Sequence, residues 1–403
     1  NVVGYIRGTK QPDQYVILGN HYDAWDTGSI DPNTGTTILV EVSRAMMQAV
    51  NQTGWRPERT LLFICWDAEE PGMIGSLEWL EENLHILQRR AVAVLNVDAV
   101  AGNRTLRLDA TPSLFELATD VAKVVPNPNR EEIQKGRTTV WDSWLHYTWN
   151  NETTTARGVD SPAMAPPNGG SDHKNFIQLA GIPALSLSYS DPEIGYPLYH
   201  SMYETVFLNE HIIFQDGQVY KAVGSFWMEV ARKLAGGGVI PMNVTDYAVL
   251  INHQKEQYEK KLKDLSSTPH FVWRQMDYLT DALARLVQAT KTFQKEIEET
   301  RTGFFDWNDQ KSQAFNERLI AFERCLIINE GLKTDSVLAR HVVYSFSLKD
   351  TYKAESGVEF FLNQLRDAKD ESGKLKIAKE VARQLSDLQY AIECAIKQLQ
   401  PLL

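Results

Sequence analysis

The 403-residue chain has few cysteines, no long basic run and no long apolar run. Its three cysteines, Cys65, Cys325 and Cys394, are too few for a disulfide framework, and Cys65 lies in an apolar stretch typical of a protein core. The formal net charge is −11, and no cluster of lysine and arginine is long enough to grip a phosphate backbone, which argues against nucleic acid as a partner. No apolar segment reaches the length of a membrane span, and no signal peptide is recognisable.

The first six residues have the pattern of a β-strand and no start methionine, so we expect the chain to begin inside a longer protein. The sequence also contains four Asn-x-Ser/Thr sequons, at Asn51, Asn103, Asn151 and Asn243. Each could arise by chance, but four together favour a secreted or cell-surface glycoprotein.

Residues 1 to about 240 alternate between short apolar runs and helical patterns. We expect strands over 15–19, 60–65, 91–97 and 184–189, and helices over 35–50 and 76–87. This alternation is typical of an α/β fold with a mostly parallel sheet and helices on both faces. Between about 126 and 172, proline, asparagine, threonine, glycine and tryptophan dominate, which predicts an irregular functional loop region.

Residues 235–238 read Ala-Gly-Gly-Gly and mark a break, after which the sequence is helical almost throughout. Two hydrophobic stripes follow, one formed by Leu279, Leu283, Leu286, Val287, Phe293 and Ile297, the other by Val381, Leu385, Leu388, Ile392 and Leu399. We therefore predict an α/β domain over 1–240 and an all-α helical bundle domain over 241–403, which is structural or a dimer surface.

Two adjacent carboxylates, Glu69 and Glu70, lie where the strand over 60–65 gives way to the helix over 76–87. In open α/β sheets this edge is where binding sites form. Because adjacent side chains there point in different directions, one glutamate can hold a metal ion while the other acts as a general base. The alternative is an acidic helix start, in which glutamate stabilises the positive end of the helix dipole.

Two histidines and two aspartates also lie at or after predicted strand ends: His21, Asp31, Asp98 and His200. Singly, such residues are more often buried polar groups or caps than ligands. Together with the glutamates, they fall at one edge of one sheet. Nitrogen and oxygen ligands without cysteine suit zinc, and five ligands exceed what one catalytic zinc ion takes from protein. Two metal ions sharing one carboxylate would use all five, and Asp23 could orient the His21 imidazole.

Around these residues the sequence resembles the glutamate carboxypeptidase II family of co-catalytic zinc peptidases. That family is also called N-acetylated alpha-linked acidic dipeptidase, and it includes prostate-specific membrane antigen. The resemblance covers nearly the whole chain, from residue 1 through 21–25, 55–57, 67–70 and 195–205 to 340–344 in the helical part. It implies a zinc-peptidase fold, two zinc ions per chain, a short peptide substrate and a homodimer formed through the helical domain.

The resemblance also assigns the ligands of the two zinc ions. It makes Asp31 the carboxylate that both ions share. His21 and Asp98 complete one zinc site, and Glu70 and His200 complete the other.

In the same comparison, Glu69 is the general base for attack by metal-bound hydroxide, and Tyr199 matches a tyrosine that hydrogen-bonds the tetrahedral intermediate. Family members carry a membrane anchor, a first stretch of the peptidase domain and an apical domain before this point. We therefore expect an ectodomain fragment at the extracellular face of the plasma membrane, or a secreted protein, with any anchor in the missing part. Glu78 and Glu81 match two ligands of a structural calcium site whose other ligands precede this chain, so calcium has weak support.

The positions that recognise acidic substrates in the family are altered. Neutral residues stand where the glutamate-cleaving members have arginine, lysine or asparagine: Ser186, Ser188, Thr351 and Ser171. Arg107 and Tyr352 are the substrate-binding residues that remain. Because serine and threonine cannot form charge-assisted bonds to a carboxylate, we expect weak or no preference for acidic dipeptides. A more general exopeptidase, acting as a carboxypeptidase or as an aminopeptidase or dipeptidase, fits better.

A second hypothesis is a non-catalytic binding ectodomain like transferrin receptor, which is similar in fold but has lost the zinc ligands. The five expected ligands and the expected base are all present, which favours the enzyme. A third expectation is that this chain folds through its helical dimer surface yet is poorly active without the apical domain.

Overall fold

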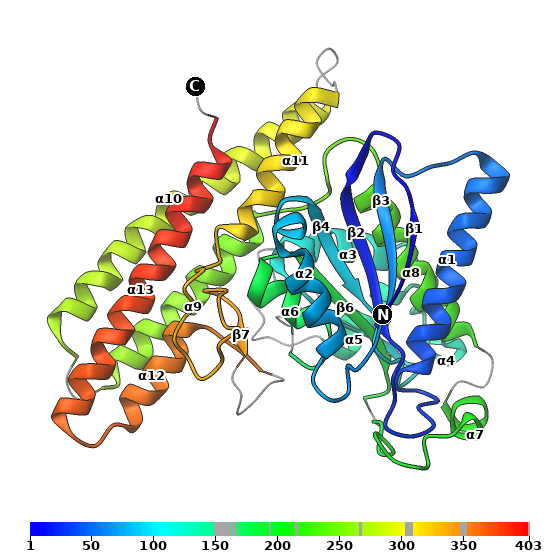
Figure 1. Ribbon diagram of the computed structural model, residues 1–403, viewed down its shortest axis with the longest axis horizontal. Coiled ribbons are helices and arrows are strands. Elements are labelled where there is room, and N and C mark those ends of the chain that lie inside the picture. The colour runs from blue at the N-terminus through cyan, green and yellow to red at the C-terminus, as the bar shows by residue number, and fades with distance from the viewer. Residues whose placement is uncertain are drawn as a thin grey trace. The chain divides into compact units, whose positions relative to one another are not determined.

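The computed structural model describes residues 1–148, 162, 167, 169–192, 195–213, 217–265, 268–302, 309–346 and 353–401 (Figure 1). The chain divides into two compact units. The first unit contains residues 1–167, 171–176 and 182–242, and the second contains residues 168–170, 177–181 and 243–403.

The first unit is built on a sheet with the strand order β1-β3-β2-β4-β6-β5. The strands are β1 Val2–Ile6, β2 Gln11–His21, β3 Arg59–Trp66, β4 Ala91–Asn96, β5 Thr105–Ala110 and β6 Ala184–Ser190. The four central strands are parallel, while β1 and β5 are antiparallel edge strands. The consecutive apolar residues of β4 are all buried, as expected of a strand covered on both faces.

Helices cover both faces of this sheet (Figure 1). The helices from residue 33 to 235 are α1 Asn33–Thr53, α2 Ile74–Arg90, α3 Phe115–Ala122, α4 Arg130–Gln134, α5 Val140–Thr148, α6 His173–Ala180, α7 Val206–Leu208 and α8 Gln218–Ala235, with a 3₁₀ turn over Pro112–Leu114 and a π-helical turn over Asn209–Ile213. Helix α8 packs on β2, β3, β4 and β6, and α1 packs on α8, while α2 packs on β2 and β4. The predicted α/β architecture is therefore confirmed.

The region over 126–172 is less irregular than its composition predicts, because it contains α4 and α5. Asn129 caps the start of helix α4, because its side chain accepts hydrogen bonds from the backbone N–H groups of Glu131 and Glu132. Helices of five and nine residues are too short to show a clear periodicity in the sequence. The expectation of a loop without regular structure is wrong over these two segments.

The second unit is mainly helical. Its elements are α9 Thr245–Lys263, α10 His270–Thr302, α11 Asp309–Arg324, β7 Ser345–Phe346, β8 Ala354–Glu355, α12 Gly357–Asp367 and α13 Glu371–Leu399. Helix α13 packs on α10, α11 and α12. The two predicted stripes, on α10 and α13, are buried, except that Val287 is only half-buried. None of the described helices is both long and apolar enough to cross a lipid bilayer.

A disulfide bond joins Cys325, just after α11, to Cys394 in α13. The sequence does not predict it, because the two cysteines are 69 residues apart and nothing local places them together. Cys65 remains a free thiol and is half-buried rather than fully buried.

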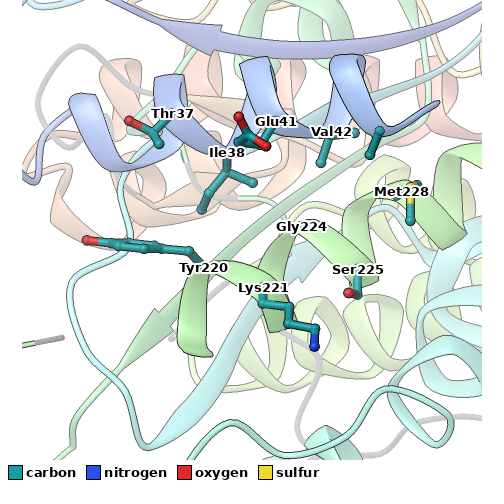
Figure 2. A pocket seen from close by; sticks show the side chains of 10 residues that line it. Thr37, Ile38, Glu41, Val42, Tyr220, Lys221, Gly224, Ser225 and Met228 are labelled. Carbon is teal, nitrogen blue, oxygen red and sulfur yellow. The ribbon is translucent and has the colours of Figure 1, made fainter. Parts of the chain in front are cut away.

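Helices α1 and α8 line an open pocket of about 320 Å³ (Figure 2). Apolar side chains from both helices line it, including Ile38, Val42 and Met228. Gly224 lies on the α8 side, where a Cβ atom would meet the methyl groups of Ile38 and Val42 at 3.4 Å, an ordinary packing distance. The residues expected to bind metal line a different part of the first unit.

Candidate metal centre

The expected ligands follow four neighbouring parallel strands. His21 ends β2, Glu70 follows β3, Asp98 follows β4, and His200 lies ten residues after β6. From β2 the chain passes through α1 to β3 on one side, and then through α2 to β4 on the other side of β2. The carboxyl ends of strands at such a reversal form a crevice in which ligands bind. The fold thus brings residues from four strand ends, and Asp31 from the loop before α1, into one place.

Each histidine faces two carboxylates. His21 Nε2 lies 3.0 Å from Asp98 Oδ1 and 3.2 Å from Asp31 Oδ1. His200 Nε2 lies 3.2 Å from Asp31 Oδ2 and 3.1 Å from Glu70 Oε2. The two oxygens of Asp31 therefore belong to two adjacent clusters, each of which could hold one metal ion.

The hydrogen bonding of His21 indicates which nitrogen would bind a cation. His21 Nδ1 lies 3.0 Å from the backbone carbonyl oxygen of Asp23, which can only accept a hydrogen bond, so Nδ1 carries the hydrogen. In neutral imidazole, Nε2 then presents a lone pair toward the oxygens of Asp31 and Asp98. A lone pair facing carboxylates requires a cation between them, either a proton or a metal ion.

Unpartnered carboxylate oxygens support a metal ion at this place. Within the described part of the chain, Asp31 Oδ1 and Glu70 Oε1 are buried and receive no hydrogen bond. Such oxygens are costly to bury unless a cation compensates them. Histidine nitrogens and carboxylate oxygens without sulfur are a ligand set that zinc accepts, so the residues fit two zinc ions.

Burial and crowding raise the pKa values of three carboxyl groups. Burial is the main cause for each of them, and nearby carboxylates add to it. The pKa of Glu69 rises to about 9, with Asp98 as the strongest charged neighbour, and that of Glu70 rises to about 7, with Asp31 as the strongest. Burial also acts to raise the pKa of Asp98, but the facing imidazole of His21 outweighs it and the pKa is lowered. This is a strongly negative pocket that divalent cations would stabilise.

The amino-acid sequence as a whole agrees with this geometry. Residues 1–210 match peptidase family M28. The chain belongs to that family. Residues 274–400 match the transferrin receptor-like dimerisation domain, which agrees with the all-α architecture of the second unit.

Curated relatives of this M28 chain confirm the resemblance found in its motifs. The chain is 39% identical to a glutamate carboxypeptidase 2 homolog of Caenorhabditis briggsae, over 99% of its own length and 52% of the relative. It is 38% identical to the Caenorhabditis elegans protein of the same name, with the same coverage. It is 29% identical to aminopeptidase NAALADL1 of Rattus norvegicus, over 100% of its own length and 52% of the relative. The chain thus spans about half the length of the curated relatives it matches.

Asp23 holds the two glutamates of the M28 centre. Its carboxylate accepts hydrogen bonds from the backbone N–H groups of Glu69 at 2.9 Å and Glu70 at 3.1 Å. It lies 3.6 Å from His21 Nδ1, farther than the backbone carbonyl of the same residue. The predicted orientation of His21 is therefore provided mainly by the backbone of Asp23, and the carboxylate fixes the turn that carries the glutamates.

Glu204 holds the loop that carries Asp31. It is buried, and its Oε1 accepts hydrogen bonds from the backbone N–H groups of Ile30, at 3.1 Å, and of Asp31. The hydroxyl of Thr27 donates to the Glu204 backbone carbonyl at 2.7 Å. Nothing in the residue pattern marks Glu204 as important, although it lies four residues after His200.

Gly35, in the first turn of α1, leaves no room for a side chain. A Cβ atom there would lie 2.2 Å from the backbone oxygen of Asp98 and 2.4 Å from Asn20 Nδ2. Asn20 Nδ2 itself donates to the Asp98 backbone oxygen at 3.0 Å. We expect Gly35→Ala to displace the end of β4, to lower the free energy of unfolding by about 1–3 kcal/mol and to weaken zinc binding.

Gly224→Ala is the matched control, since its added methyl group meets neighbours only at packing distance. Alanine in place of a helical glycine should raise the free energy of unfolding by about 0.5–1 kcal/mol. Urea denaturation and zinc titration of both variants test the difference. Equal stabilities, or unchanged zinc affinity in Gly35→Ala, would show that the close approach at Gly35 is not rigid.

Tyr199 lies directly on His200, one of the expected ligands. Its ring stacks on the His200 imidazole with the centroids 3.6 Å apart and the planes at 22°, and 48% of the side chain remains exposed. His200 has a φ of 57°, in the left-handed region that few residues other than glycine occupy.

The expected substrate-binding residues are placed in different ways. Ser171 is buried, accepts a hydrogen bond from Asn96 Nδ2 at 2.9 Å and hydrogen-bonds Asp98, so it contacts one of the expected metal ligands. Arg107 is exposed on β5, directly opposite Ser188 of β6. Tyr352, like Thr351, lies outside the described residues.

The glycosylation and calcium positions also differ in their surroundings. Asn51 is exposed in α1, and Asn151 lies outside the described residues. Asn103 is half-buried, and its Nδ2 donates to the backbone oxygen of Ile213 at 3.0 Å. Asn243 is also half-buried. Glycosylation stays a prediction, and Asn51 is the sequon that is exposed in the described part of the chain.

The two glutamates of the possible calcium site, Glu78 and Glu81, are exposed on α2.

Proposed function

We propose that this chain carries the metal centre of a di-zinc exopeptidase. The observation that supports it most is the position of Asp31, whose two carboxylate oxygens face His21 and His200 separately, at 3.2 Å in each case. Asp98 completes one ligand set and Glu70 the other. Membership in family M28 supports the same proposal. Zinc ions bound there would polarise a peptide carbonyl group and lower the pKa of a water molecule.

Glu69 is the proposed general base. It is buried beside the ligands, and its backbone is fixed by Asp23. Burial and the neighbouring carboxylates raise its pKa to about 9 in the chain alone, and two divalent cations beside it would lower that pKa, so that the ionised carboxylate can accept a proton. In this role Glu69 takes a proton from the attacking water and gives it to the leaving amine. Tyr199, which stacks on His200 and is 48% exposed, is the proposed donor of a hydrogen bond to the oxygen of the reacting carbonyl.

We propose short peptides without an acidic preference as substrates. Ser186 and Ser188 are half-buried on β6, and the Ser188 hydroxyl already donates to the backbone oxygen of Ala99. Because the hydroxyl groups of these serines are neutral, they add no positive charge beside Arg107 that would help to bind a substrate carboxylate.

We further propose that the protein acts as a homodimer outside the cell. The match of residues 274–400 to a dimerisation domain supports self-association through the second unit. The exposed sequon at Asn51 supports an extracellular location, either secreted or anchored through a part of the protein that is not in this chain.

Elemental mass spectrometry of the purified, dialysed protein tests the metal centre, and peptide hydrolysis tests the substrate class. We expect two zinc ions per chain, and neutral dipeptides to be cleaved at least as fast as N-acetyl-aspartyl-glutamate. No zinc after dialysis, and none taken up on titration, would contradict the enzyme and favour a binding ectodomain. A strong preference for the acidic dipeptide would contradict the proposed substrate class alone.

A further inference from the structure

The loop between His21 and Asp31 carries a tryptophan that the catalytic proposal does not use. Trp25 is 57% exposed. The loop around it is held in place, because the backbone N–H of Tyr22 donates to Trp66 at 3.0 Å and the hydroxyl of Thr27 donates to Glu204 at 2.7 Å. A large apolar ring is thus held in solvent by a loop fixed at both ends, beside two expected metal ligands.

Trp25 and Tyr199 both contact His200. The Trp25 ring meets the imidazole edge-on, with the centroids 6.4 Å apart and the planes at 68°. Tyr199 stacks on the same imidazole at 3.6 Å. If these rings only supported the histidine, they would be expected to be buried, yet each residue is about half exposed. Two largely exposed aromatic residues thus lie beside the same expected metal ligand.

We propose that Trp25 is a specificity-determining residue that, with Tyr199, forms an aromatic clamp beside His200 for an apolar or aromatic side chain next to the scissile bond. The inference rests on the proposed peptidase function and narrows its substrate class. Exposed aromatic faces gain by burial against apolar side chains, and aromatic pairs gain further from ring packing.

Charge at the clamp favours a neutral side chain. The groups that contact His200 Nε2 are the carboxylates of Asp31 and Glu70. Two divalent ions would balance these carboxylates together with Asp98 and Glu69, so neither an acidic nor a cationic side chain gains much from them. The aromatic rings could still attract a lysine or arginine, and the experiment must separate that outcome.

The test compares Trp25→Ala and Trp25→Phe with the wild-type chain on dipeptides that carry phenylalanine, leucine, alanine, lysine or glutamate on either side of the bond. We expect wild type to prefer phenylalanine and leucine on one side. Trp25→Ala should raise KM for those substrates about 3- to 10-fold, the range expected for loss of one aromatic contact, and change KM for alanine less than about 2-fold. Trp25→Phe should restore most of the preference. Tyr278→Ala is the control, because Tyr278 is 51% exposed on α10 in the second unit.

Two further measurements, zinc content and binding of amino acids to the zinc-loaded chain, separate the possible outcomes. All variants should retain two zinc ions per chain. An equal loss of kcat/KM on every substrate would overturn the clamp and make Trp25 a support for His200 only, and a loss confined to lysine substrates would overturn the apolar preference. If wild type cleaves no peptide, the proposed function fails, and calorimetry of the zinc-loaded chain still decides the clamp. Weaker binding of phenylalanine, relative to alanine, in Trp25→Ala supports it, and unchanged relative binding overturns it.

Discussion

Glu69→Gln is expected to lower kcat by about 10²–10⁴-fold while both zinc ions remain bound, because glutamine fills the same space but cannot accept a proton. The backbone N–H of Glu69 would keep its bond to Asp23, so the turn that carries Glu70 should not move. Glu69 belongs to neither expected ligand set, so both sets stay complete in the glutamine variant and zinc should remain bound. Steady-state kinetics with a neutral dipeptide and elemental analysis of the same preparation measure the two effects together.

Glu81→Gln is the matched control for this experiment. Glu81 is exposed on α2, and its loss should leave kcat and zinc content unchanged. Activity of Glu69→Gln within about tenfold of wild type would mean that another group takes the proton. Loss of one zinc ion would instead make Glu69 a ligand, and the roles of the two adjacent glutamates would have to be exchanged.

The central sheet could be predicted because its strands are buried on both faces. Continuous apolar runs over 60–65 and 91–97 identify β3 and β4 to within about one residue at each end. The edge strand β5 could not be predicted in this way. It mixes exposed Arg107 with buried neighbours, and its antiparallel pairing with β6 depends on contacts distant in sequence. The Cys325–Cys394 bond was missed for the same reason, since only the packing of α11 on α13 brings the two residues together.

Part of the site could be predicted, because the carboxyl ends of neighbouring parallel strands lie at the same edge of a sheet. That rule alone places His21, Glu70 and Asp98 at one edge of the sheet. It does not identify the side chains that hold the expected ligands in place by hydrogen bonds to their backbone. Asp23 binds the N–H groups of the glutamate turn, and Glu204 binds those of the loop before α1, and neither partner can be read from spacing. A pattern of residue types shows which atoms could bind a metal, but not which neighbours hold them there.

Asp31→Asn should reduce bound zinc from two ions to fewer than one per chain, whereas Asp98→Asn and Glu70→Gln should each lose mainly one. Asp31 presents one oxygen to each histidine, so its loss leaves both clusters with a single carboxylate. An asparagine oxygen carries no charge and can face only one of the two sites. Mutation of a residue that only hydrogen-bonds a metal ligand typically lowers metal affinity about 10–100-fold. Loss of a ligand shared by both ions should therefore lower zinc affinity at least about 100-fold at each site. Zinc titration monitored by calorimetry measures both sites.

Asp26→Asn is the control for this prediction, because Asp26 is exposed on the same loop and should keep two zinc ions. Asp31 is buried, so circular dichroism and thermal unfolding must first show that Asp31→Asn is folded. A folded variant that retains one zinc ion with wild-type affinity would mean that Asp31 serves a single site. The second cluster would then need a further ligand, and the case for a shared carboxylate in this chain would fail even if the protein proved to be a zinc peptidase.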